Sequence, residues 1–128
     1  LVKMAELYLE LPARRCHSEV FFGQTVDELT KKETKRALYK GIEGIARCAQ
    51  FNPYIAGEQL TAADIVFLYS ADLASVVAGK LFGFDLLDMA PGAKQLMTIL
   101  NQREDVIKIA EDRKIGNINF KKYIASLT

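Results

Sequence analysis

Residues 60–78 constrain the fold of this chain most, because they combine a helix start with a long apolar run. Thr61 and Asp64 have the spacing of a capping box, in which the threonine hydroxyl accepts the amide of residue 64 and the carboxylate accepts the amide of Thr61. Leu60 and Ile65 have the spacing of a hydrophobic staple across the same helix start. The rest of the stretch is apolar nearly all round, which predicts a helix buried in the middle of a bundle.

Asp72 interrupts this apolar run. It follows Asp64 by a little over two helical turns and is therefore expected near the same face of the helix. A buried carboxylate needs a partner, such as an arginine or a helix N-terminus. We expect structural pairing at Asp72 in preference to catalysis, because buried ionic networks also perturb pKa values.

Apolar residues recur at three- and four-residue spacing through the rest of the chain, and no segment alternates apolar and polar residues as a half-buried strand would. The pattern predicts an all-α bundle of about five to six helices in a single domain, residues 1–128. The first expected helix runs from Val2 to a kink or end near Glu10 caused by Pro12, and the next runs from Ala13 to Phe22 before Gly23. A second capping box, at Thr25 and Glu28, opens a helix to about Ala49, and the helix that begins at Thr61 runs to about Lys80. The last two run from Pro91 to about Gln102 and from Val106 to a point before Gly116, with a last turn in the tail to Thr128.

Two glycines, Gly41 and Gly44, lie in the second long helical segment. Each costs about 1 kcal/mol relative to alanine within a helix. Small residues at these positions would let another helix approach closely.

The chain has 17 basic and 16 acidic side chains and a net charge of +1, which is no reason to expect nucleic acid or an anionic membrane as a partner. The longest apolar run falls short of a membrane span and contains Asp72, so no membrane helix is expected. The first residues, Leu-Val-Lys-Met-Ala, show no basic region or cleavage site of a signal peptide. Because the chain opens in mid-pattern, we expect a fragment of a longer protein.

Catalytic signatures such as Cys-x-x-Cys, a phosphate-binding loop or a metal-spaced cluster are absent from the sequence. We therefore predict no catalytic residue and no metal site. His17 follows Cys16 directly, but neighbours on a helix point about 100° apart and do not face each other. Cys16 and Cys48 are expected as free, buried or half-buried thiols in a reducing compartment, while a single disulfide between them stays open.

Two groups of side chains could bind a ligand. Arg14 and Arg15 could hold an anion in a bidentate fork, although a solvated or salt-bridged helix face accounts for them as well. Five aromatic residues could line an apolar pocket, although helical spacing of aromatics more often indicates core packing: Tyr8, Phe21, Phe22, Tyr69 and Phe84.

The segment from Tyr54-Ile-Ala-Gly57 into the capped helix resembles a known signature. Its residues match the pattern Gly-x-x-Leu-Thr-x-Ala-Asp-Ile of the all-helical C-terminal domain of glutathione transferases, in which the capped helix is buried and central. The matching residues are Gly57, Leu60, Thr61, Ala63, Asp64 and Ile65.

The resemblance implies a thioredoxin-like domain of roughly 80 residues upstream, absent from this chain. That domain would supply most of the glutathione site and the residue that activates the thiol. The helical domain would form one wall of the electrophile site and much of a homodimer interface in a cytoplasmic detoxification enzyme. Glutathione would be a co-substrate of the parent protein, with no other cofactor. From helix order, the resemblance suggests Tyr8, Arg15 and Tyr69 as substrate-binding residues.

Two other functions remain open. Helical domains of this kind also occur in translation factors and aminoacyl-tRNA synthetases, so the chain could be a non-catalytic adaptor that pairs with a partner. An unrelated ligand-binding bundle, such as the effector domain of a repressor, would need an upstream helix-turn-helix. The sequence upstream of this domain would separate the three.

Overall fold

The computed structural model describes residues 1–127, which form helices and loops and, within that range, no named β-strand. The all-α prediction is therefore confirmed. The elements are α1 (Val2–Ala5), the π turn η1 (Glu6–Glu10), α2 (Leu11–Arg14), α3 (His17–Phe22), α4 (Glu28–Cys48), α5 (Ala62–Val77), the π turn η2 (Ala78–Phe82), the 3-10 turn η3 (Leu86–Met89), α6 (Ala93–Asn101) and α7 (Glu104–Ser126). Contacts divide the chain into two compact units, one of residues 1–97 and one from Thr98 onward.

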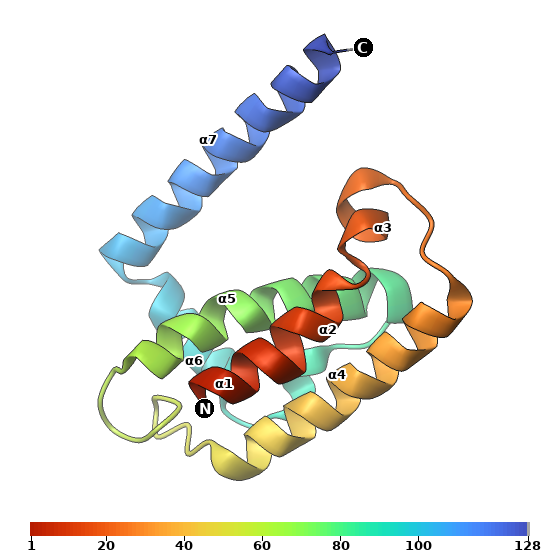
Figure 1. Cartoon of the computed structure of the whole chain (residues 1–128). Helices are drawn as coiled ribbons and strands as arrows, with labels where there is room; N and C mark the ends of the chain where they lie inside the picture. Colours follow the sequence, from red (N-terminus) through yellow and green to blue (C-terminus); the bar gives the residue numbers. More distant parts are fainter. Residues whose placement is uncertain (128) are drawn as a thin grey trace. The chain divides into compact units, whose positions relative to one another are not determined.

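The first unit is built around its N-terminal helical segment, α1 to α2, which contacts both α4 and α5 (Figure 1). The segment buries one stripe at helical spacing: Ala5, Leu9, Ala13 and Cys16. The facing core side chains are branched or aromatic and fully buried: Leu38, Ile42 and Ile45 from α4, and Phe67 and Val77 from α5. Alanines opposite these larger side chains let the backbones approach closely, so the three helical segments share one core.

Pro12 does not end the first helical segment, contrary to the sequence prediction of a kink or an end near Glu10. The wider turn η1 comes just before it, and Pro12 lies in the first turn of α2. The π turn widens the helix just before the proline, and this lets the segment continue although proline has no amide hydrogen to donate. The helix breaks instead at Arg15 and Cys16, within the helix predicted from Ala13 to Phe22. Helix α3 then ends at Gly23, as predicted, and Gly23 is in the left-handed conformation (φ 68°).

Helix α4 begins two residues later than the predicted capping box at Thr25 and Glu28 would place it, so that prediction was wrong. Its N-cap is Asp27, whose Oδ1 accepts the amide of Thr30 at 2.7 Å and whose Oδ2 accepts the Thr30 hydroxyl at 2.9 Å. A carboxylate caps well and also carries the charge that a helix N-terminus favours. These hydrogen bonds, from the Thr30 side chain first and its amide second, lower the pKa of Asp27 from its usual 3.8.

Asp27→Ala is expected to lower the melting temperature by about 3–5 °C at neutral pH. Because the pKa of Asp27 is lowered on folding, its stabilisation is present above the usual pKa and is lost as pH falls through the lowered value. Thermal melts at pH 7 and below pH 3 should therefore show the difference from the unsubstituted chain shrinking in acid. Thr25→Ala is the matched control and should leave the melting temperature unchanged. If Thr25→Ala lowered the melting temperature more than Asp27→Ala does, Thr25 would be the capping residue of α4 after all.

The capped helix α5 lies in the core as predicted, although many of its residues are only half-buried: between Ala63 and Ala78, every residue is buried or half-buried except Asp72, which is exposed. The expectation of a buried, paired Asp72 was wrong. Eight residues along a helix of 3.6 residues per turn correspond to a rotation of about 80°, which is enough to carry Asp72 from the buried side where Asp64 lies to the solvent side.

The turn η2 extends α5 without interruption to Phe82, and Gly83 ends it in the left-handed conformation. The combined helix, Ala62–Phe82, is long and apolar enough to cross a membrane by length and composition alone. The helix is therefore longer than the apolar run that we expected to fall short of a membrane span. The helix packs against α1, η1 and η3 in the first unit, as the core helix of a bundle does.

The predicted helix boundaries near the C-terminus differ from the structure. Helix α6 starts two residues after Pro91, because Gly92 takes a positive φ of 91° and packs against Phe51. Helix α7 runs through Gly116, where a helix end was predicted. A glycine stops a helix when it takes the left-handed conformation, and Gly116 is not among the positive-φ residues. The predicted last turn is part of α7, and Thr128 lies outside the described residues.

Candidate functional site

The loop before α5 is tied to the helix by one buried carboxylate. Asp64 is fully buried, and its Oδ2 accepts the amide of Thr61 at 2.7 Å, which completes the predicted capping box. Its Oδ1 accepts the amide of Ile55 at 2.8 Å, a contact that the local motif does not predict. Leu60 and Ile65 are both half-buried, and the staple contact between them stays a prediction. Asp64 thus satisfies donors on both sides of the loop, which is a structural role.

Tyr8 and Tyr69, two of the three predicted substrate-binding residues, come from elements that pack together. Tyr8 lies in η1 and is about half exposed, while Tyr69 lies in α5 and has a buried hydroxyl. A hydrogen bond of 3.5 Å between the Ser70 hydroxyl and Glu10 joins the same two elements. The structure therefore brings the two tyrosine-bearing elements together, and a role in binding stays a prediction.

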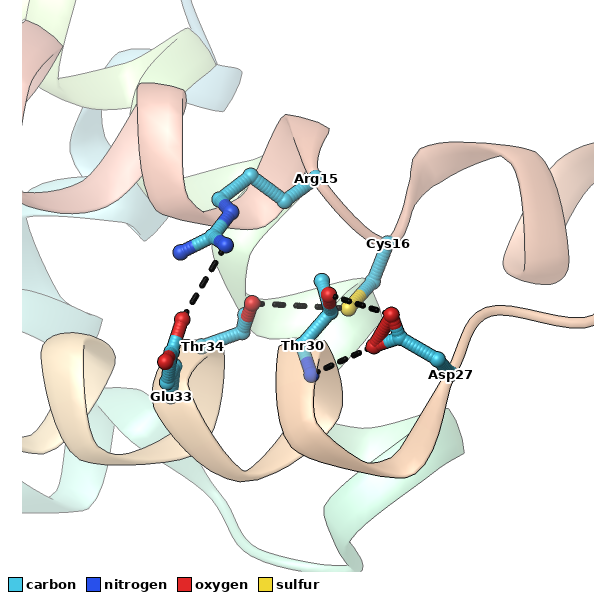
Figure 2. A network of polar contacts seen from close by, with 6 residues as sticks. All are labelled: Arg15, Cys16, Asp27, Thr30, Glu33 and Thr34. Atoms are coloured by element: carbon cyan, nitrogen blue, oxygen red, sulfur yellow. Dashed lines mark hydrogen bonds and ion pairs between the residues drawn. The ribbon is translucent and has the colours of Figure 1, made fainter.

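Arg15, the third predicted residue, is engaged with α4. Its Nη2 donates to Glu33 Oε2 at 3.1 Å, in an exposed ion pair that Figure 2 shows beside Cys16 and Thr34. Arg14 pairs with Glu10 on its own helical segment at 2.8 Å. Both arginines are therefore salt-bridged, as the simpler of the two sequence interpretations has it. An anionic ligand at Arg15 would have to compete with Glu33.

The five candidate aromatic residues include members of two separate ring clusters. Phe84 stacks on Tyr39 of α4, with ring centroids 4.4 Å apart. Phe21 packs on His17 within α3 at 4.6 Å, and both Phe21 and Phe22 are exposed. Phe84 is half-buried against the partly exposed ring of Tyr39, whereas the α3 phenylalanines lie on the surface.

The cysteines are free, as predicted. Cys16 is buried, as predicted, with its Sγ 3.5 Å from the Thr34 hydroxyl of α4. Cys48 is exposed at the last residue of α4, so the prediction of a buried or half-buried thiol was wrong there. His17 packs on its own helix against Phe21, so the adjacent cysteine and histidine contact different groups. Among residues 1–127, no group of three or more His, Cys, Asp or Glu side chains could hold a metal ion.

An exposed apolar face on the first helical segment was missed at the sequence level. Leu7, Tyr8 and Leu11 are 50%, 47% and 54% exposed. The spacing of Leu7 and Leu11 puts them on one face of the segment, away from the buried stripe of Ala5 and Leu9. The sequence contained a sign of this face: Leu7 and Leu11 are additional to the buried stripe, so the segment is apolar on more than one side.

A helical bundle whose capped, buried helix carries the signature from Gly57 to Ile65 is the type of domain that the sequence predicted. No protein-family profile matches the chain. A glutathione S-transferase from Pseudomonas putida is 40% identical over 126 residues, which are 98% of this chain and 57% of that protein. The chain thus spans a little over half the length of this relative. The predicted resemblance to the C-terminal helical domain of a glutathione transferase is confirmed.

Proposed function

We propose that this chain is the helical domain of a protein that conjugates glutathione to electrophiles, where it forms part of the hydrophobic electrophile site and of a homodimer interface. The observation that carries the proposal is the 40% identity to a glutathione S-transferase over nearly the whole chain. No observation favours the adaptor function that the sequence left open.

The apolar face of Leu7, Tyr8 and Leu11 supports the electrophile site. About half of each side chain remains exposed, so a hydrophobic molecule that covers them would remove further apolar surface from water. Tyr8 combines an apolar ring with a hydroxyl, which suits it to orient a partly polar electrophile. Tyr69, on the adjacent helix, would contribute from the side of α5. Arg15 would bind an anionic group in exchange for Glu33.

The chemistry of the proposed reaction requires a thiolate, which attacks an electrophilic carbon. We assign activation of the glutathione thiol to an upstream thioredoxin-like domain. The helical domain would supply binding and orientation of the electrophile. We further propose a cytoplasmic location, with neither nucleic acid nor membrane as a partner. The isolated chain should accordingly show no glutathione conjugation, and turnover of an aryl halide by the chain alone would contradict this division of roles.

Tyr8→Ala, in the full-length protein, is expected to raise the KM for a hydrophobic aryl halide about tenfold, because the substrate loses an aromatic contact. The KM for glutathione should stay within about twofold, since the proposal places glutathione on the other domain. Steady-state kinetics with each substrate varied in turn would measure both.

Leu29→Ala is the control for this experiment, because Leu29 is a similarly exposed apolar residue in the first turn of α4. It should change neither constant. An unchanged KM for the aryl halide in Tyr8→Ala, or a change confined to glutathione, would remove Tyr8 from the electrophile site.

A further inference from the structure

Helix α3 (His17–Phe22) has the local features of a segment that moves as a unit. It is six residues long, and none of its residues is buried. On one side, Cys16 breaks the helix with φ −109° and ψ 8°; on the other, Gly23 has a φ of 68° and open space around it. Segments with few buried contacts open at low free energy, so α3 is suited to local opening.

A small number of contacts hold α3 in place. Glu19 Oε1 lies 2.8 Å from Lys31 Nζ of α4, with the two side chains only 17% and 22% exposed. The same oxygen accepts the amide of Val26 at 3.1 Å, which ties down the loop after α3. Lys80 Nζ lies 5.9 Å from the centre of the Phe21 ring. The pair of Glu19 and Lys31 is thus the charged contact that joins α3 to the long helix α4.

The pKa values of the two groups agree with this geometry. The hydrogen bond from Lys31 is the largest cause that lowers the pKa of Glu19, and the hydrogen bond to Glu19 is the largest that raises the pKa of Lys31. Each group therefore favours its charged form when α3 is in place.

Cys16 couples the position of α3 to the exposure of a thiol. Its backbone is the joint between α2 and α3, while its side chain is fully buried with Sγ against Thr34 of α4 (Figure 2). A rotation of α3 about this joint changes the backbone angles of Cys16 itself, and a change in its φ carries the sulfur away from Thr34. The same residue is therefore both a pivot and a buried thiol.

We propose that α3 and the loop after it form a flap, latched to α4 by Glu19 and Lys31, whose local opening exposes the Cys16 thiol while the rest of the bundle stays folded. The closed flap keeps the thiol unreactive. An agent that breaks the latch makes Cys16 available to thiol-directed modification without unfolding the protein.

The test is the rate at which Cys16 reacts with an aromatic disulfide reagent. Cys48→Ser, at an exposed site, leaves Cys16 as the single thiol of the whole chain. In this background, Lys31→Met should raise the reaction rate about fivefold, the size expected for losing one well-formed ion pair. Lys32→Met, a neighbouring exposed lysine, is the matched control and should leave the rate unchanged.

Urea separates local from global opening. If the flap opens locally, the logarithm of the reaction rate should depend on urea much more weakly than global unfolding followed by circular dichroism does. Glu19→Gln, which keeps an oxygen for the Val26 amide, should match Lys31→Met, and the double variant should react no faster than the faster single variant.

Two results would overturn the proposal. One is an equal rate in the Lys31→Met and Lys32→Met chains. The other is a urea dependence of labelling equal to that of global unfolding, which would mean that Cys16 reacts only through the unfolded chain.

Discussion

Asp64→Ala is expected to lower the free energy of unfolding by about 3 kcal/mol and the melting temperature by about 10 °C. The carboxylate accepts two backbone amides, from Ile55 and from Thr61, at 2.8 and 2.7 Å. Removing it leaves both donors without this acceptor, one of them in a buried hydrogen bond, and takes a favourable charge from the start of α5. Urea and thermal denaturation followed by circular dichroism would measure the loss.

Asp72→Ala provides the control on the same helix. Asp72 is exposed, so its removal should change the free energy of unfolding by no more than about 0.5 kcal/mol. Asp64→Asn should fall between the two, because the amide keeps one acceptor oxygen but loses the charge. Equal stability of the Asp64→Ala and Asp72→Ala chains would mean that the capping box and the tie to Ile55 contribute little.

Substitution by alanine is expected to change the stability of the chain in opposite directions at two glycines of α4, Gly41 and Gly44. A Cβ at Gly41 would lie 2.9 Å from the Tyr8 Cβ and 3.0 Å from the Tyr8 carbonyl carbon, and closer still to the carbonyl oxygen. Because these are mainly backbone atoms, a rotamer change cannot relieve the overlap. Gly41→Ala is therefore expected to destabilise the chain by about 2 kcal/mol, even though alanine favours the helix.

Gly44→Ala is expected to stabilise the chain by up to about 1 kcal/mol. Its added Cβ would meet only the Met4 methyl, at an ordinary 3.6 Å. Equilibrium denaturation of both variants measures the contrast, and crystal structures would show whether η1 moves away from α4 in Gly41→Ala. Destabilisation of similar size at both positions would show that helix propensity and the approach of Tyr8 do not decide the outcome.

The two glycines show where sequence reasoning succeeds and where it stops. Their small size predicted a close approach of another helix, and the structure confirms this at Gly41. The sequence did not say which glycine would be in contact, because the two are alike within α4 and only the path of the first segment distinguishes them. Arg15 is a similar case. An arginine side chain indicates an anionic partner, and the structure shows that this partner is the carboxylate of Glu33 in α4.

The errors in the helix boundaries have a common physical origin. Thr25 with Glu28 has the capping-box pattern, yet Asp27 caps α4, because overlapping cap candidates differ by amounts that the surrounding loop can override. Gly116 could end a helix only by taking a left-handed conformation, which it does not. Pro12 was expected to disturb the helix, but the π turn before it lets the segment continue.

The sequence by itself determined the all-helical fold, the capped and buried α5 and the resemblance to the transferase helical domain. These rest on interactions within a few residues of each other, such as the box at Thr61 and Asp64, and on helical periodicity. Only the tertiary structure decided that Asp64 also holds Ile55, that Asp72 faces solvent, and that Cys16 is buried against Thr34. Each of these depends on the rotation of a helix about its axis and on which segment packs against it, and both are set by contacts between residues far apart in the chain.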